Sequence, residues 1–431
     1  MSNTFRNLAG VTLLAILSAG FLGLLSVLLM NSGAKETVTH LHRIRRVATA
    51  WSTHWQYSAD PTLLRSALSQ SDAEPPPVLV GSTLYALGSD GRLHALDPQN
   101  GTGPAFDVGA RRRPVTFRAT SSRLVVVARA LNQATGLPDA SLVGVDPITR
   151  AVVWDQPLGM DVFIDSVDVD ADTVYLGVGD NVDGGQWRSL RDRGAAPSLH
   201  PRIRAYALAS GIPRWEQALP ERSDTGPTDG LSLIVVGTEV VATEFAGGAS
   251  SGVVVFDRGS GQIRWRDLSG TQALGTLGNR LVAVSGTDVL IMTTTSGAIV
   301  DRLTGVAPNK PEATLVSGRS LYWTGSDQVG ALDLQGKRQP WKPTQLDYPT
   351  GIDSGGTESS KRMTRPDVEN GHLYVGGRDD AVYSIDVRTG AVEWKFPAPR
   401  RAVPSTDYPP LRVGDLMLVQ DSQLTAYEAP G

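Results

Sequence analysis

The strongest constraint on the fold of this chain is a short phrase that recurs along it. An apolar run ends in Asp, and a Trp follows eight residues later. The four full copies are Asp146 with Trp154, Asp257 with Trp265, Asp333 with Trp341 and Asp386 with Trp394, three of which contain Gly261, Gly336 or Gly390 in between. Self-similarity at a period of about 20 to 50 residues indicates one supersecondary unit stacked many times. The repeat therefore predicts a single β-propeller and not several independent domains.

The repeat units share an order of four strands. Second strands are expected at Thr83, Thr173, Ser320 and His372, each with a Leu-Tyr or Val-Tyr pair. Third strands are expected at RLHALD, SLVGVD, IRAYAL, GVVVFD, DVLIMT, QVGALD, AVYSID and QLTAYE. Alternating apolar residues between Gly and Asp turns are typical of half-buried strands, and Asp90-Gly91 is a strong hairpin turn. Eight third strands predict an all-β fold with eight blades.

The eighth unit has no fourth strand of its own. It reaches Gly431 three residues after Glu428, which takes the Asp position of the repeat. The segment from Trp55 to Ala59 matches the fourth strands that begin at Trp154, Trp215 and Trp394. We therefore expect this N-terminal strand to complete the eighth blade and close the ring, which removes an exposed sheet edge.

The residues from Ile385 to Trp394 carry a family resemblance. They resemble the A-x-D-x-x-T-G-x-x-x-W repeat of the PQQ-like (quinoprotein alcohol dehydrogenase-like) eight-bladed propellers, over about residues 47 to 431. In that family the Trp docks between neighbouring blades. The resemblance implies this docking role for six residues, Trp55, Trp154, Trp215, Trp265, Trp341 and Trp394, whereas the first unit has Phe106 nearby and the fifth has Asp301.

Two branches of the family bear on function. Quinoprotein dehydrogenases hold PQQ and Ca²⁺ over the central channel, and those with the most similar repeat use a vicinal Cys pair and an Asp base. The other, BamB-like branch is a non-catalytic scaffold of outer-membrane β-barrel assembly and is normally a lipoprotein. This chain is similar to the second branch in size and repeat, but it has no Cys for lipidation.

Composition removes several classes of function. The absence of Cys excludes disulfides, thiolate metal sites, Cys nucleophiles and a lipid-anchored Cys. A formal net charge of −4 gives no basic footprint for a phosphate backbone, so nucleic acid is not an expected partner.

An apolar run from Leu8 to Met30 contains no charge in 23 residues, and about 20 suffice to cross a bilayer. It predicts a single transmembrane helix, with a cleaved signal peptide as the rival interpretation because Ser32 and Ala34 are spaced like a cleavage site. The predicted divisions are a tail at 1–7, the helix at 8–30, a juxtamembrane linker at 31–46 and the propeller at 47–431. Basic residues beyond the helix favour a cytoplasmic propeller, but this rule is weak beside a long domain. We expect an extracytoplasmic propeller in a single-pass protein of the cell membrane.

No motif in the sequence predicts catalysis. Asp168, Asp170 and Asp172 resemble the start of a Ca²⁺ loop, but Thr173 and Gly179 stand where Gly and Glu are needed, so a strand and its turn are expected. The six His residues lack ligand spacing, and no phosphate loop or nucleophile elbow has a fitting context. We therefore predict no catalytic residue, no metal, no cofactor and no enzyme activity.

The repeats are lengthened in three consecutive blades. Insertions are expected at about Ala130 to Ala140, Gly179 to Pro201 and Phe245 to Ser251, at the end of the disc that also holds the long link from Gln345 to Arg365. Loops on a rigid scaffold are where binding usually resides, although surface insertions are also tolerated at low cost. Within the second insertion lie four candidate partner-binding residues of the types enriched in binding hot spots, Trp187, Arg188, Arg191 and Arg193.

The resulting expectation is a non-catalytic, membrane-anchored propeller that mediates protein–protein interaction in the bacterial cell envelope. The alternative is a protein that binds a small ligand or PQQ in its central channel, including a quinoprotein-type oxidoreductase. A membrane sensor is a third interpretation, but only about seven residues precede the apolar run, too few for an output domain.

Overall fold

The structure is a computed structural model, and it describes seventeen stretches of the chain. These are residues 52–57, 77–88, 90–109, 112–131, 138–160, 162–181, 199–220, 230–246, 249–267, 269–307, 311, 313–325, 327–346, 363–377, 381–397, 410–420 and 424–428. The predicted membrane span from Leu8 to Met30 lies outside them. Within them, no helix has the length and apolarity needed to cross a bilayer.

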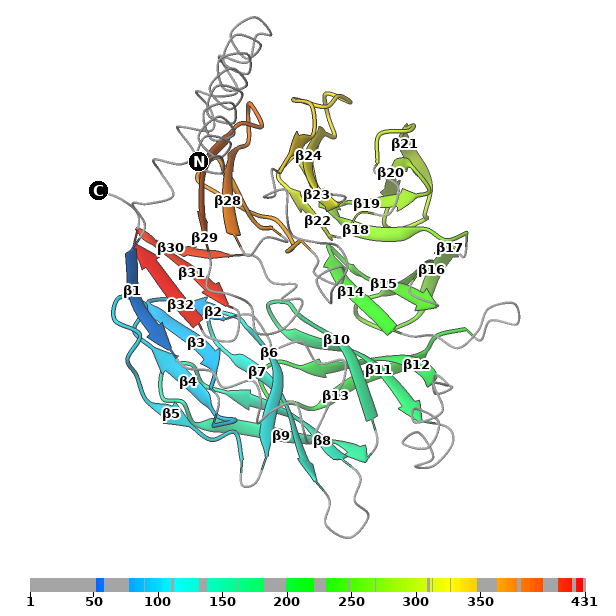
Figure 1. Ribbon diagram of the computed structural model, residues 1–431. Coiled ribbons are helices and arrows are strands. Elements are labelled where there is room, and N and C mark those ends of the chain that lie inside the picture. Colours follow the sequence, from blue (N-terminus) through cyan, green and yellow to red (C-terminus); the bar gives the residue numbers. More distant parts are fainter. Residues whose placement is uncertain are drawn as a thin grey trace, which may run out of the picture.

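Eight antiparallel sheets of four strands each are arranged in a ring (Figure 1). Blade 1 contains β2 (Val78–Val80), β3 (Thr83–Leu87), β4 (Leu93–Leu96) and β5 (Ala105–Phe106). Blade 2 contains β6 (Arg113–Ala119), β7 (Leu124–Leu131), β8 (Pro138–Val145) and β9 (Val152–Met160). Blade 3 contains β10 (Val162–Val169), β11 (Thr173–Asn181), β12 (Leu199–Ala207) and β13 (Pro213–Ala218). Blade 4 contains β14 (Gly230–Val236), β15 (Glu239–Ala246), β16 (Ala249–Asp257) and β17 (Ile263–Asp267).

The second half of the ring repeats this order. Blade 5 contains β18 (Gln272–Leu277), β19 (Arg280–Ser285), β20 (Asp288–Thr293) and β21 (Ile299–Leu303). Blade 6 contains β22 (Ala313–Ser317), β23 (Ser320–Gly325), β24 (Gln328–Asp333) and β25 (Thr344–Gln345). Blade 7 contains β26 (Asp367–Glu369), β27 (His372–Gly376), β28 (Ala381–Asp386) and β29 (Val392–Pro397). The prediction of an all-β, eight-bladed propeller is confirmed.

Blade 8 combines strands from the two ends of the described chain. It contains β30 (Leu411–Val413), β31 (Leu416–Gln420) and β32 (Leu424–Glu428), and its outermost strand is β1 (Ser52–Tyr57). β1 runs antiparallel to β32, with Ser52 opposite Glu428 and Tyr57 opposite Leu424. The N-terminal strand therefore supplies the missing fourth strand and closes the ring.

The middle strands of the blades are buried on both faces, so the expectation of half-buried strands is wrong for them. In β7, Leu124, Val125 and Val126 are all fully buried, although consecutive side chains point to opposite faces of the sheet. The reason is that each blade is covered by a neighbour on either side. Alternation is seen in outer strands such as β9, where Trp154 is buried and Val153 is exposed, and in the inner strand β14.

The hairpins between second and third strands are longer in blades 2, 3 and 4 than elsewhere. Their strands contain eight or nine residues, compared with four to six in the other five blades. The ladders continue to the pairs Leu131 with Pro138, Asn181 with Leu199 and Ala246 with Ala249. Part of each expected insertion is therefore an extension of the β-ladder and not a loop.

Candidate functional site

The boundaries between adjacent blades are here called seams. Four of them contain the same kind of hydrogen bond. A Trp on the outer strand of one blade donates its indole N–H to a backbone carbonyl in the turn between the third and fourth strands of the next blade. The pairs are Trp154 with Leu208 (2.9 Å), Trp215 with Arg258 (2.9 Å), Trp265 with Thr294 (2.5 Å) and Trp341 with Val387 (3.0 Å). In every case the acceptor is the residue directly after the last residue of the third strand. The recurring Trp therefore joins consecutive blades.

A glycine in the same turn makes room for the indole ring. Gly211 has a φ of +70°, and a Cβ built on it would lie 2.5 Å from the ring of Trp154. Gly261, Gly297 and Gly390 have the same left-handed backbone and the same close approach to Trp215, Trp265 and Trp341. Only Gly satisfies both demands without strain. Gly336, which the sequence pattern grouped with these residues, does not occupy this position; Lys337 does, with a φ of +53°.

The seam between blades 5 and 6 replaces the aromatic contact by an ion pair. Asp301 stands where the other outer strands carry Trp, opposite Ile291 in the ladder. Lys337 occupies the receiving position on blade 6, and its Nζ lies 2.8 Å from Asp301 Oδ2. Without an indole ring to accommodate, the turn has room for a side chain at this position.

The seam between blades 1 and 2 also lacks a Trp but keeps the hydrogen bond. The Tyr85 hydroxyl, from the second strand of blade 1, donates to the carbonyl oxygen of Pro147, which directly follows the Asp146 position. Arg150 takes the place of Gly in this turn, with a φ of +61°. Phe106 packs edge-on against Tyr85, with 6.2 Å between ring centroids. The two seams without Trp are four blades apart, on opposite sides of the ring.

The surroundings of the other two predicted docking residues, Trp394 and Trp55, are described only in part. Trp394 lies beside Tyr374 of its own blade, with 5.8 Å between ring centroids. Trp55 is opposite Ala426 in the β1–β32 ladder, and its side chain lies outside the described part of the structure.

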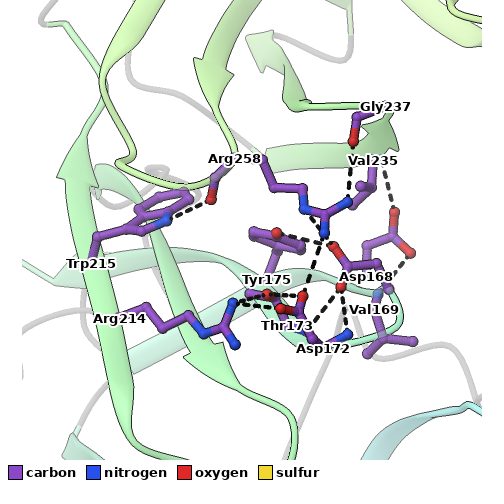
Figure 2. Close-up of polar contacts among 11 residues, drawn as sticks. Asp168, Val169, Asp172, Thr173, Tyr175, Arg214, Trp215, Val235, Gly237 and Arg258 are labelled. Atoms are coloured by element: carbon purple, nitrogen blue, oxygen red, sulfur yellow. Dashed lines mark hydrogen bonds and ion pairs between the residues drawn. The ribbon is translucent and has the colours of Figure 1, made fainter.

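A network of charges reinforces the seam between blades 3 and 4 (Figure 2). The backbone carbonyl of Arg258 accepts the indole N–H of Trp215. The guanidinium of the same residue places Nε 3.2 Å from Asp170 Oδ2 and donates to the Gly237 carbonyl at 3.1 Å. Arg258 Nη2 also lies 3.4 Å from Asp172 Oδ1.

Arg214 and Thr173 complete this network. Arg214 Nη1 lies 3.1 Å from Asp172 Oδ2 and donates to the Thr173 hydroxyl at 2.7 Å. The Thr173 hydroxyl donates to Asp172 at 2.8 Å, and this bond, together with Arg214, lowers the pKa of the Asp172 carboxyl.

The three aspartates of the apparent Ca²⁺ loop therefore have structural roles. Asp168 lies on β10, and Asp170 and Asp172 lie in the turn that follows it, as the strand-and-turn interpretation predicts. Asp170 and Asp172 already contact arginines. Among the described residues, no three His, Cys, Asp or Glu side chains converge as metal ligands would.

A second set of charges lies on or just before inner strands of the blades. Asp168 Oδ2 accepts the backbone N–H of Val235 in the neighbouring inner strand at 3.1 Å. Burial raises the pKa of the Asp168 carboxyl, against the opposing effects of this bond and of the charge of Arg118 on β6. Arg365 lies just before β26 and keeps an exposed side chain; partial loss of hydration and the charge of Arg118 lower its pKa. The charges of Arg118, Asp168 and Arg365 thus influence one another although they come from distant parts of the chain.

The four candidate partner-binding residues, Trp187, Arg188, Arg191 and Arg193, lie outside the described residues. They belong to residues 182–198, between the paired ends of β11 and β12 at Asn181 and Leu199. Of the long link from Gln345 to Arg365, the structure describes only Gln345, Leu346 and residues 363–365. For the second insertion the structure describes the ladder at its two ends, where Gly179–Asn181 pair with Leu199–Pro201.

Comparison with known structures finds the same fold at low sequence identity. BamB from Moraxella catarrhalis matches with a TM-score of 0.53 and 12% identity over 88% of this chain and 99% of that one. Quinohemoprotein alcohol dehydrogenase from Comamonas testosteroni matches with a TM-score of 0.56 and 11% identity over 90% and 77%. A computationally designed protein, Ika8, matches with a TM-score of 0.55 and 12% identity over 84% and 98%. These likenesses concern the fold alone, since they include a BamB, an enzyme and a designed protein.

The protein-family comparison is more specific. No match is found among curated protein sequences. A family model described as "Outer membrane protein assembly factor BamB" matches residues 138–310 and 325–430, which is more than half of the chain. The chain therefore belongs to this BamB family of PQQ-like β-propellers.

Proposed function

We propose that this protein is a non-catalytic, membrane-anchored scaffold that mediates protein–protein interaction in the bacterial cell envelope. The observation that carries the proposal is the group of long hairpins on blades 2, 3 and 4. Membership of the BamB family supports it, because the family description names an assembly factor.

The three long hairpins suit a binding surface. They occupy consecutive blades and lie at the same end of the disc, because each connects a second strand to a third. Their ladders are paired along their length, so a partner would meet backbone that is already ordered, which lowers the entropy cost of association. Residues 182–198, which include one Trp and three Arg, connect the two strands of the middle hairpin in the sequence.

Anchoring and location are part of the proposal. The apolar run from Leu8 to Met30 is long enough to cross a bilayer, and the absence of Cys rules out a lipid anchor on that residue. In this arrangement the transmembrane helix holds an extracytoplasmic propeller at the membrane, as lipidation does for other members of the BamB-like branch.

The test is affinity capture from crosslinked native membranes. Deletion of the whole insertion from Gly179 to Pro201 would remove paired residues from β11 and β12, so residues 182–198 alone are replaced by an Asn-Gly turn. The control is Arg388→Ala, an exposed residue at the opposite end of the disc. A partner lost with the shortened hairpin and retained by the control supports the scaffold. A partner retained by all forms, or the absence of any partner, contradicts it.

A second candidate is a ligand in the central channel, favoured by the mutual influence of the charged residues Arg118, Asp168 and Arg365. The described residues do not fit the PQQ set of the dehydrogenases, because the chain has no Cys pair and these residues include no cluster of three metal-binding side chains. Titration of the protein with PQQ and Ca²⁺ tests this candidate. Saturable binding that Arg118→Ala and Arg365→Ala both abolish would favour it over the scaffold.

A further inference from the structure

The outer rim of blades 2 to 5 exposes aliphatic side chains at one end of the disc. They lie in the turns between third and fourth strands or in the first two residues of the outer strands. The aliphatic rim consists of Ile148 (85% exposed), Val152 (42%), Val153 (47%), Ile212 (63%), Ile263 (37%), Ile299 (47%) and Val300 (46%). Single exposed aliphatic residues need no explanation, but here four consecutive blades carry one at nearly the same position of the repeat.

The other described blades provide an internal comparison. In blade 6 the corresponding exposed residues are Lys337, Arg338 and Gln339. Blade 7 exposes Arg388 and Glu393, while its Val392 is half-buried. Blade 1 exposes Gln99 and Asn100 in the same turn. Among the turns that the structure describes, the aliphatic character is therefore confined to blades 2 to 5, and it is not a requirement of the repeat.

The chain enters the propeller at this same end. Ser52, the first residue of β1, is opposite Glu428, the last residue of the third strand in blade 8. The aliphatic rim likewise follows the last residues of third strands, at Val145, Ala207, Asp257 and Thr293. Because all third strands run in the same direction along the disc, Ser52 and the rim lie at one end, and the long hairpins lie at the other.

The segment upstream of Ser52 connects this end to the apolar run. Residues 31–51 separate Met30 from Ser52, and a chain of that length spans at most about 70 Å when fully extended. From the shared end and the rim we infer that the aliphatic rim rests on the surface of the lipid bilayer. This inference relies on the membrane anchor of the proposed function and adds an orientation: the long hairpins point away from the membrane.

A bilayer fits the rim better than a compact protein partner. The rim side chains are spread over four blades at one end of the disc. The extended surface of a bilayer can contact side chains that are separated in this way. Two of the nearby arginines are paired within the propeller, Arg214 with Asp172 and Arg264 with Asp257, so their charges are balanced locally. Because the rim itself is aliphatic, contact is expected to depend on aliphatic insertion and to need no anionic lipid. A tether also raises the local concentration of the rim at the bilayer, so a weak contact is sufficient.

The test uses the full chain in nanodiscs of phosphatidylethanolamine and phosphatidylglycerol. Because the chain has no Cys, single substitutions give unique labelling sites for a bimane fluorophore. Ile212→Cys and Ile299→Cys probe the rim, and Gln99→Cys and Gln335→Cys probe the same turns in blades 1 and 6. We expect a lipid with a nitroxide headgroup to quench the two rim labels several-fold more than the control labels, and aqueous iodide to show the reverse order. The same result is expected in nanodiscs without phosphatidylglycerol.

The outcomes separate this inference from the proposed function. Equal lipid quenching at all four sites, or none at any site, overturns the rim contact. If the protein meanwhile resists extraction by alkaline carbonate, the anchor stands and only the rim inference fails; if it is extracted, the anchored scaffold fails as well. Rim labels in native membranes that are shielded from iodide but not quenched by lipid would show that a protein covers the rim, which also overturns the inference.

Discussion

Asp301 on blade 5 and Lys337 on blade 6 form an ion pair, with 2.8 Å between Lys337 Nζ and Asp301 Oδ2, at the place where four other seams hold a Trp against a Gly. Both positions of this contact differ from those four seams, since Asp301 replaces the Trp and Lys337 replaces the Gly. A Trp at 301 would meet the side chain of Lys337, and a Gly at 337 without an indole ring would leave the turn uncovered.

This relationship predicts that an aromatic seam can be restored only by changing both residues. Asp301→Trp alone should destabilise the protein, because an indole placed as in the other seams comes within about 2.5 Å of a Cβ, as Gly211 shows for Trp154. Adding Lys337→Gly should recover this loss and relieve the left-handed strain of a non-Gly residue, about 1 kcal/mol. Urea denaturation of both single variants and the double variant measures the coupling. Additive effects would contradict the interpretation.

Trp154→Ala should cost about 3 to 5 kcal/mol of unfolding free energy, since it removes a buried ring and its bond to the Leu208 carbonyl.

Gly211→Ala tests the receiving side of the same seam. Gly278→Ala is the matched control, because Gly278 has a φ of +60° and no atom within 4 Å of its Cβ position. The control should lose only about 1 kcal/mol, from backbone strain. Gly211→Ala should lose clearly more, because its methyl group also meets the Trp154 ring. Equal losses in chemical denaturation would show that the close approach has no energetic weight.

Ring closure can be tested with a disulfide across β1 and β32. Ser52 and Glu428 face each other in an antiparallel ladder, where paired Cα atoms lie about 4.5 to 5.5 Å apart, within the range that a disulfide bridges. Ser52→Cys with Glu428→Cys should raise the unfolding free energy by about 2 to 4 kcal/mol when oxidised. A reductant should remove the gain in the same sample. A melting temperature that is the same with and without reductant would contradict closure by this pair.

The turn aspartates predict acid sensitivity. The backbone N–H groups of Thr389 and Arg388 donate to the carboxylate of Asp386 and lower its pKa in the folded protein. A lowered folded pKa means that the stabilisation is complete above the unfolded value of about 3.9 and is lost as pH falls below it. Asp386→Asn keeps an acceptor oxygen but does not titrate. The gap in melting temperature between the native protein and this variant should therefore shrink below about pH 4, and a gap independent of pH would refute the assignment.

The sequence predicted the architecture because each blade carries its own signal. The Asp-to-Trp spacing, the eight third strands and the match of Trp55 to other outer strands were sufficient for blade number and closure, since local patterns repeat with the fold. Burial of the middle strands was missed because an alternating pattern cannot reveal that a second blade covers the other face. The ion pair of Asp301 with Lys337 was also missed, although the loss of Trp from one unit and of the receiving Gly from the next was a readable signal.

The functional surface could be predicted only in outline. The insertions in three consecutive blades were visible as extra length, but the sequence did not show that Gly179–Asn181 and Leu199–Pro201 extend a ladder. The charges of Arg118, Asp168 and Arg365 lie far apart in the chain and on different blades, so no local pattern connects them. The rim from Ile148 to Val300 consists of aliphatic residues in turns and at the starts of strands, and no sequence pattern distinguishes them from buried residues until their exposure is known.

The pairing of β1 with β32 also determines the order in which this protein can reach its native state. A ribosome completes β1 before any other strand of the propeller and β32 after all of them, so the eighth sheet is the last to form. Contacts between such distant segments form slowly, and until then β1 and β32 each present an unpaired edge. During that interval β32 of one molecule can accept either its own β1 or the β1 of another molecule. Closure by a terminal strand thus makes correct folding a competition with domain swapping, and the outcome depends on the concentration of the newly made chains.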